Sequence, residues 1–325
     1  MRAHLRTLIV MMIAITICAL SLSSAAAVKQ RVALIMNQPL GDPFANLVYA
    51  GLQKLEKERD IDAKLIESLD KSEHVEQVRA MARLGYNPVL VLWEDLADAA
   101  IQVAPEFPET KFIVLDCYTS ADLPNVQTVV MEPQEASFLA GVVAARTTES
   151  KHVGFIGGSD LPVIEKFLAG FKAGAEYIDP AIKIDVAYAG TFIDPAKGLE
   201  MGRMMFASGA DVVMHAANKT GLGVLRAAAE AGKWGIGVDM WQGDVAPGHV
   251  LWSALKDATN ATYLMAKKAL GGEFEQGLFI FGASTGAQLY DERDLEALPE
   301  DLKVQVMEIE EQLRDGSIVV PSTVN

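Results

Sequence analysis

Short β-branched runs alternate with amphipathic stretches along this 325-residue chain, and the alternation restricts its fold more than any other feature. Helical periodicity near 43–59, 72–85 and 94–105 separates the first four predicted strands. Strands that alternate with helices in this way form a parallel sheet with helices on both faces. The first group of predicted strands lies at 32–37, 61–66, 88–92, 111–116 and 125–130.

The same rhythm begins again after a linking helix predicted over 133–147. Its strands are predicted at 152–156, 183–188, 211–215 and 235–239, and its helices at 161–177, 195–208 and 220–231. The fold class is therefore α/β, with two doubly wound parallel-sheet lobes. A strand at 250–254 and a helix at 256–270 follow. If that helix packs on the first lobe, the chain crosses between the lobes at least twice more, which makes a hinge of several strands.

These boundaries divide the chain into three parts. Residues 1–27 are a signal peptide. Residues 28–131 with about 256–274 form the N-terminal lobe, and residues 132–255 with about 275–325 form the C-terminal lobe.

The first 27 residues have the composition of an export signal, with a basic start, an apolar run over 8–22 and small residues before the predicted cleavage site after Ala27. We expect a periplasmic protein. The alternatives are an uncleaved membrane anchor and a lipid anchor at Cys18, although the residues before Cys18 lack the small side chains of a lipidation site.

The net charge of -15 excludes a nucleic-acid partner and an anionic membrane surface. Cys117 is the one cysteine beyond the signal, so the mature chain has no intramolecular disulfide and depends on a large apolar core. We expect a monomer that binds a small molecule.

Ligands of open parallel sheets bind beyond the carboxyl ends of the strands. Asp116 and Asp239 each end an apolar strand, where a carboxylate can accept hydrogen bonds from a polyol or from a base N–H. The alternative role for either residue is to cap the next helix or turn.

Four aromatic residues fall in strand-end loops: Phe44, Trp93, Phe192 and Trp241. A ring stacked on a flat heterocycle contributes roughly 1–3 kcal/mol, and two rings can enclose one heterocycle. The alternative is that each ring covers the edge of its lobe's core.

Asn218 and Lys219 lie at the N-terminus of the helix predicted at 220–231, where free N–H groups suit an acceptor on a ligand. Neither glycine-rich phosphate motif is present there. The histidines beyond the signal are not spaced as a metal site, and no nucleophile elbow occurs. His215, at a strand end, is either a ligand contact or a structural residue. We expect no catalytic residue, no metal and no cofactor.

Several long segments resemble the basic membrane protein family, the purine-nucleoside receptor group of bacterial ABC-importer solute-binding proteins. They are 135–145, 153–180, 190–202, 209–232, 236–248 and 315–321. The resemblance implies a type I periplasmic-binding fold, a nucleoside held between the lobes, a membrane permease as partner and no reaction.

It also implies roles for single residues. Phe44 matches the family's aromatic that stacks on the base, and Asp239 matches the carboxylate that holds the ribose hydroxyls. Lys256 matches a lysine that contacts the sugar region, and Asp116 matches the strand-four aspartate.

Three loops depart from the family pattern. In the first loop, Asp42 and Asn46 flank a sequence in which the asparagine moves by one position. Asn218 and Lys219 replace glycines, and Trp241 is an added indole. Sugar recognition is therefore better supported than the identity of the base.

We expect a receptor whose closure around a purine nucleoside signals occupancy to the permease. Three alternatives remain: another flat ligand such as a free purine base or a flavin, a sensory receptor, and an enzyme such as a nucleoside hydrolase.

Overall fold

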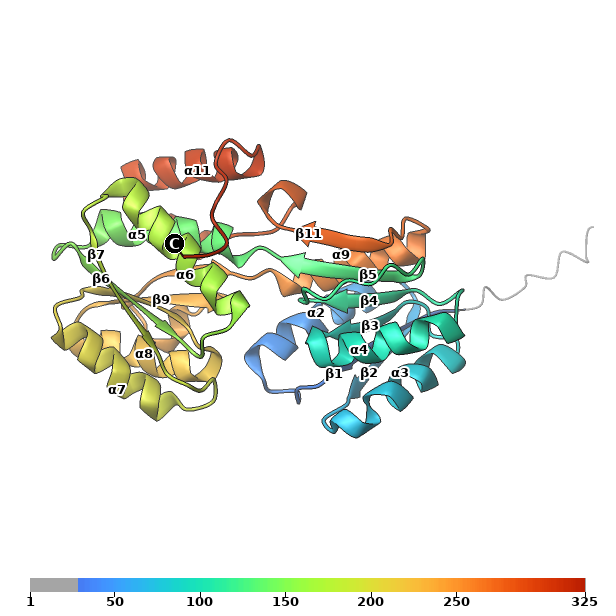
Figure 1. The fold of residues 1–325 in the computed structure, drawn as a ribbon. Helices are drawn as coiled ribbons and strands as arrows, with labels where there is room; N and C mark the ends of the chain where they lie inside the picture. Colours follow the sequence, from blue (N-terminus) through green and yellow to red (C-terminus); the bar gives the residue numbers. More distant parts are fainter. Residues whose placement is uncertain (1–28, 325) are drawn as a thin grey trace, which may run out of the picture.

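The computed structural model describes residues 29–324, so the expected signal peptide and its cleavage site lie outside the described residues. Two α/β lobes stand side by side and are joined along one edge (Figure 1). Both sheets are parallel, as the alternation of strands and helices predicts. None of the helices in the described range has the length and hydropathy to cross a bilayer.

The first lobe has a six-stranded sheet in the order β11-β5-β4-β3-β1-β2. Its strands are β1 (Gln30–Met36), β2 (Ile61–Glu67), β3 (Val89–Leu92), β4 (Phe112–Leu115), β5 (Val126–Met131) and β11 (Gly277–Phe281). Helices α2 (Pro43–Glu58) and α9 (Ala258–Gly271) cover one face. Helices α3 (His74–Arg83) and α4 (Trp93–Val103) cover the other, so the central strands are buried on both sides.

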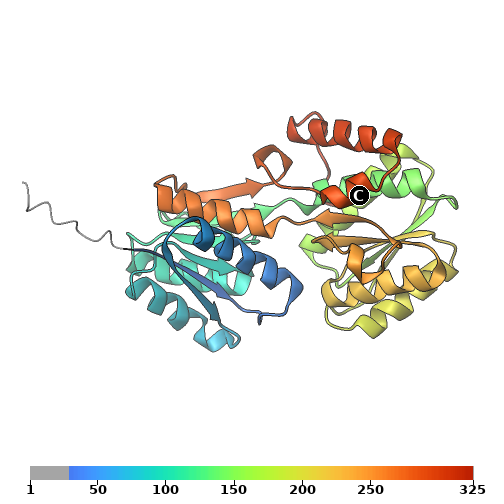
Figure 2. The ribbon, with the colours of Figure 1, turned by 180° about the vertical axis from the view of Figure 1, so that it is seen from behind.

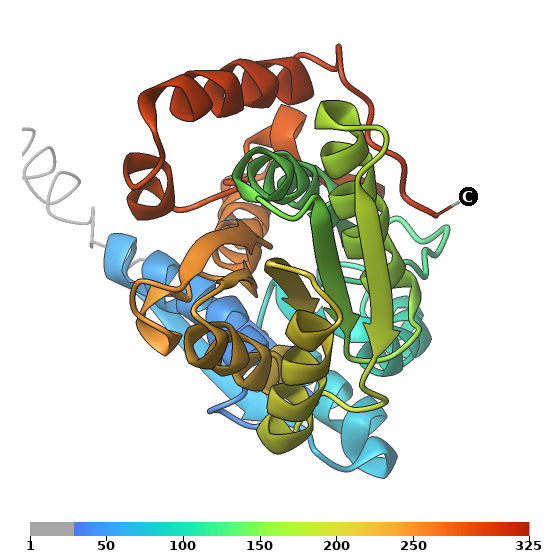
Figure 3. The ribbon, with the colours of Figure 1, turned by 90° about the vertical axis from the view of Figure 1, so that its left-hand side faces the viewer.

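The second lobe has a five-stranded sheet in the order β10-β9-β8-β6-β7. Its strands are β6 (His152–Gly157), β7 (Lys183–Tyr188), β8 (Val212–Ala216), β9 (Trp234–Asp239) and β10 (Val250–Leu255). Helices α5 (Pro133–Thr147) and α6 (Pro162–Ile178) pack on one face, and α7 (Pro195–Ala207) and α8 (Asn218–Ala231) on the other (Figure 3). The C-terminal helices α10 (Glu292–Glu296) and α11 (Glu300–Arg314) also join this lobe.

The chain passes between the lobes three times: from β5 to α5, from β10 to α9, and after β11. Helix α9 packs on α2 of the first lobe (Figure 2). The prediction of at least two further crossings depended on this packing, and it is confirmed. One predicted boundary is wrong. The sequence pattern places residues 277–281 in the second lobe, but they form β11, which pairs with β5 at the edge of the first sheet.

Helices α5 and α6 approach each other closely because glycines face the opposing backbone. A Cβ on Gly174 would lie 1.9 Å from the carbonyl oxygen of Phe138, and one on Gly141 would lie 2.2 Å from that of Phe171. The two helices can therefore pack backbone to backbone only while these positions carry no side chain.

Candidate ligand site between the lobes

Four of the predicted site residues have a left-handed backbone. The φ angles are 65° at Trp93, 53° at Asp116, 47° at Asn218 and 69° at Asp239. Among the non-glycine residues from 29 to 324, Lys151 is the one other case. Such backbone strain costs on the order of 1 kcal/mol or more per residue and concentrates at binding sites. The four positions lie at or just after the carboxyl ends of β3, β4, β8 and β9, where the strand-end rule predicts a ligand.

A buried ion pair joins the hinge to the first lobe. The ammonium group of Lys256, which follows β10, lies 2.7 Å from both carboxylate oxygens of Asp116 after β4. The two side chains are 5% and 6% exposed. The indole Nε1 of Trp93 donates a 2.9 Å hydrogen bond to the same carboxylate. Because both charged groups are buried, neither can exchange its partner for water, and each holds the other in place.

The rings of Phe44 and Trp93 stack on each other. Their centroids are 5.7 Å apart and their planes differ by 11°, so the rings are in direct contact. Each ring therefore covers one side of the other, and the two rings do not stand on opposite sides of a ligand. The pair offers a ligand one aromatic face, on the side of the partly exposed Trp93, because Phe44 is 5% exposed. The Lys256 ammonium lies 4.8 Å from the centroid of the Phe44 ring.

Asp42 positions Phe44 and also contacts the second lobe. Its Oδ1 accepts hydrogen bonds from the backbone N–H groups of Phe44 (3.0 Å) and Ala45 (3.1 Å), which caps α2. Its Oδ2 accepts a 2.9 Å hydrogen bond from Nδ2 of Asn218, the first residue of α8. This bond spans the cleft between the lobes.

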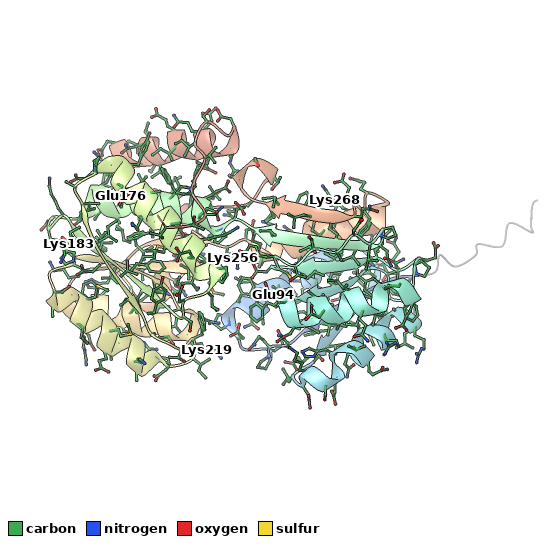
Figure 4. All side chains as sticks on the ribbon, in the orientation of Figure 1. Glu94, Glu176, Lys183, Lys219, Lys256 and Lys268 are labelled. Carbon is green, nitrogen blue, oxygen red and sulfur yellow. The ribbon has the colours of Figure 1, made fainter. Side chains whose placement is uncertain are left out.

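Asn218 keeps one further acceptor. Its Oδ1 is buried and has no hydrogen-bond partner among residues 29–324. The neighbouring Lys219 is partly exposed at the edge of the second lobe that faces the first (Figure 4). Asn46 lies apart from this group: it is exposed, and its Oδ1 accepts a 3.1 Å hydrogen bond from the N–H of Gly41 within the first loop.

Asp239, the last residue of β9, is partly exposed, and its carboxylate receives no hydrogen bond within the described part of the chain. Burial raises its pKa to about 6; the positive charge of Lys256 opposes that shift, and the carboxylates of Asp116 and Asp42 add to it. The backbone N–H of Lys256 donates to the carbonyl of Asp239 over 3.2 Å, which keeps the two residues adjacent. A carboxylate with no protein partner beside a buried ammonium can accept hydrogen bonds from a neutral ligand.

The other two predicted aromatic residues lie away from the Phe44–Trp93 face. The indole Nε1 of Trp241 donates a 3.0 Å hydrogen bond to Asp294, and the guanidinium carbon of Arg293 lies 3.6 Å from its ring centroid. Phe192 is partly exposed and covers Gly158, where a Cβ would lie 2.2 Å from the ring. Trp241 is thus held by residues around α10, and Phe192 by the end of β6.

A cavity of about 340 Å³ opens beside Asp239 and Lys256 on the hinge side of the cleft. It is also bordered by Trp241, by Leu47 in α2 and by Asn260 in α9. The strand-end rule misses Leu47 and Asn260 because both lie inside helices. The helical periodicity of the sequence shows which residues share a face of α2 or α9. It does not show which of those faces is turned toward the hinge, so it could not identify these two residues.

His215 has a structural environment. Its side chain is fully buried, its Nε2 lies 2.9 Å from Oε1 of Gln242, and burial lowers its pKa to about 4. Its ring also packs against Gly221, where a Cβ would lie 1.9 Å from Nδ1. Of the two roles left open for His215, the structure supports the structural one.

Comparison with known proteins gives consistent matches. The family model described as "ABC transporter substrate-binding protein PnrA-like" matches residues 29–321. The "CD4+ T-cell-stimulating antigen" of Listeria monocytogenes is 32% identical over 302 residues, covering 86% of this chain and 84% of the relative. The "ABC transporter nucleoside-binding protein BmpA" of Lactococcus lactis is 30% identical over 301 residues, covering 86% and 85%.

Solved structures match the fold. A solute-binding protein of an ABC transporter system from Aeropyrum pernix superposes with a TM-score of 0.75 at 23% identity, covering 90% of this chain and 94% of the other. A periplasmic solute-binding protein from Actinobacillus succinogenes with bound D-allose gives a TM-score of 0.61 at 19% identity, covering 78% and 96%. At these identities the likeness concerns the fold alone, which is the two-lobed periplasmic-binding architecture.

Proposed function

The chain belongs to the Bmp family of PnrA-like ABC transporter substrate-binding proteins, and from this premise we propose that it binds a purine nucleoside between its lobes and presents it to the permease of an ABC importer. Proteins of this family are carriers that bind a small molecule for a transporter. The proposal names the class of ligand and the direction of transport.

The observation that carries the proposal is the carboxylate of Asp239. It has a left-handed backbone, has no hydrogen-bonding partner in residues 29–324, and lies next to the buried Lys256–Asp116 pair. A carboxylate can accept two hydrogen bonds from the neighbouring hydroxyls of a ribose, and charged acceptors form stronger bonds than neutral ones. In this arrangement the base stacks on the face formed by Phe44 and Trp93.

The relative from Lactococcus lactis, whose name describes it as nucleoside-binding, supports the same ligand class for this chain. A free purine base would leave Asp239 without hydroxyls to bind, so we favour a nucleoside over a base. We also propose that the chain is exported, cleaved after Ala27, and acts in the periplasm, because substrate-binding proteins of ABC transporters work outside the cytoplasmic membrane.

Calorimetric titration of the purified mature chain with adenosine, guanosine, inosine and the matching free bases tests the proposal. We expect nucleosides to bind at least tenfold more tightly than their bases. Asp239→Ala should weaken nucleoside binding by about 2 kcal/mol, or roughly 30-fold, because it removes hydrogen bonds to a charged acceptor.

Asp244→Ala is the matched control, since Asp244 is an exposed carboxylate on the loop after the same strand. If no nucleoside binds, the proposed function is wrong. If nucleosides bind and the two variants bind them equally well, Asp239 does not contact the ribose. Mass spectrometry of any molecule released from the purified protein then identifies the ligand directly.

A further inference from the structure

The cavity of about 340 Å³ beside the hinge connects the buried part of the site to the surface. Lys256, almost fully buried, lies at its inner end, and the exposed residues Gln288 and Arg293 lie at its rim. Its inner wall includes Asp239, which is the proposed contact for the ribose hydroxyls. The cavity therefore begins where the sugar of a bound nucleoside would end.

One wall of this cavity is formed by a stacked pair of side chains, Trp241 and Arg293. The guanidinium group of Arg293 stacks on Trp241, with its carbon 3.6 Å from the ring centroid. Asp291 holds that guanidinium through hydrogen bonds of 2.7 and 2.8 Å, and Asp294 accepts the indole N–H. Leu47 adds an apolar side chain to the lining. An indole and an aliphatic side chain suit an uncharged group, because the burial of apolar surface is favourable and the burial of an unpaired charge is not.

The charges around the cavity do not favour an anion. Arg293 is paired with Asp291, and Lys256 is paired with Asp116, so each cation already has a carboxylate partner. The carboxylate without a protein partner in the described chain is Asp239 itself. A phosphate in the cavity would meet that carboxylate and would compete for cations that are already neutralised.

Resting on the proposed nucleoside site, we propose that this cavity is a subsite for an uncharged substituent at the 5′ position of the ligand, such as a 5′-thioether. A ribose whose base stacks on the Phe44–Trp93 face and whose ring hydroxyls bind Asp239 has its exocyclic 5′ carbon as the remaining point of attachment. The receptor accordingly accepts 5′-alkylthio nucleosides and rejects 5′-phosphates.

Titration of the mature protein with adenosine, 5′-deoxy-5′-methylthioadenosine and adenosine 5′-monophosphate tests the subsite. We expect the thioether to bind at least as tightly as adenosine, and the monophosphate to bind at least 100-fold more weakly. Trp241→Ala should lower the affinity for the thioether relative to adenosine about tenfold.

Leu47→Trp, which fills the cavity from the opposite wall, should lower the same ratio without disturbing Trp241 or its partners. Trp234→Ala is the matched control: Trp234 begins the same strand, is 37% exposed and does not border the cavity. It should leave the ratio unchanged.

The outcomes separate the two proposals. If adenosine binds but the thioether binds more than 30-fold more weakly, or if both cavity variants leave the ratio unchanged, the subsite is disproved and the nucleoside receptor stands. If the monophosphate binds as tightly as adenosine, the cavity does not exclude anions, and the proposal of a subsite for uncharged groups is wrong. If neither adenosine nor the thioether binds, the proposed function itself is wrong.

Discussion

At the scale of single residues, Asp239 combines a strained backbone with an unfavourable electrostatic position. Its φ is 69°, and burial together with the carboxylates of Asp116 and Asp42 raises its pKa to about 6 against the pull of Lys256. Both features lower the stability of the ligand-free protein, and both place an acceptor where a ligand can use it. Binding sites commonly carry this conflict between function and stability.

Asp239→Asn should therefore stabilise the ligand-free fold at pH 7 by on the order of 2 kcal/mol, a value reduced from the full shift because the residue is partly exposed. The pKa of Asp239 is higher in the folded state than its ordinary value of 3.8, so the folded state takes up a proton first as the pH falls. The wild-type protein thus regains stability between pH 6 and pH 4 relative to the variant. Urea denaturation at pH 7 and pH 4 measures the difference.

Asp244→Asn is the control for that experiment, because an exposed carboxylate should show little difference at either pH. An advantage of Asp239→Asn that is equally large at pH 7 and pH 4 would contradict the electrostatic explanation.

Lys256→Met leaves the carboxylate of Asp116 buried without its cation. We expect a loss of about 3–5 kcal/mol in the free energy of unfolding, the usual effect of breaking a buried pair from one side. The double variant Lys256→Met with Asp116→Asn should recover most of this loss, because it buries no charge, keeps an acceptor for the indole N–H of Trp93 and tolerates the left-handed backbone. Urea denaturation measures all three proteins.

Lys71→Met is the matched control, because the Lys71–Asp95 pair is exposed and should contribute less than about 1 kcal/mol. A double variant as unstable as the single one would show that the ion pair itself stabilises the fold.

At the scale of secondary-structure elements, the local pattern of apolar, polar and turn-forming residues predicts where most strands and helices lie. The predicted bounds of β7 and α5 agree with the structure. Strand β7 mixes β-branched and polar residues, as suits an edge strand, and α5 begins at a proline, which is favoured at the first position of a helix. Strand β11 is different. Its partner β5 lies about 150 residues earlier, and nothing in "GLFIF" alone indicates to which sheet it belongs.

In the candidate site, too, some positions follow from local sequence pattern and others depend on residues far away in the chain. Trp93, Asp116, Asn218 and Asp239 lie at strand ends, so the rule for parallel sheets places them together without knowledge of the loops. The orientation of Trp241 depends on α10, which comes some 50 residues later in the chain. A side chain's direction in a loop is set by such distant partners, so the sequence pattern did not predict it.

Gly174→Ala should destabilise the second lobe by about 1–3 kcal/mol, because the new methyl group would meet the carbonyl oxygen of Phe138. Gly271→Ala is the matched control. Gly271 ends α9, and a Cβ there would have its nearest neighbour at 3.6 Å. Since alanine favours helix more than glycine does, that control should gain up to about 1 kcal/mol. Thermal unfolding of both variants decides whether the close approach of α5 and α6 limits the packing.

At the scale of the whole molecule, contacts between the lobes lie on two sides of the cleft. One is the hydrogen bond from Asn218 to Asp42. The other is the ammonium of Lys166 in α6, which lies 4.8 Å from the ring centroid of Tyr118 after β4. Together with the three connecting segments, these contacts join the two lobes across the cleft.

Asn218→Gly should favour opening, because it removes the hydrogen bond across the cleft while glycine tolerates the left-handed backbone. A bond of about 1–1.5 kcal/mol corresponds to a five- to tenfold faster release of bound ligand. Stopped-flow measurement of the dissociation rate tests this. Lys233→Ala, an exposed position after the other end of α8, serves as the control and should leave the rate unchanged. Equal rates in all three proteins would exclude a role for the bond in closure.

The position of β11 also affects how the molecule is made. A polypeptide is synthesised from its amino end, and β11 follows every strand of the second sheet in the chain. The first lobe therefore stays incomplete until all the strands of the second lobe have been synthesised. Until then one side of β5 is unpaired and α2 is not covered by α9. An open sheet edge pairs readily with other chains. A ribosome that stalls before residue 277 thus releases a product with an aggregation-prone edge, and a deletion that removes the last quarter of the gene damages the half of the protein encoded first.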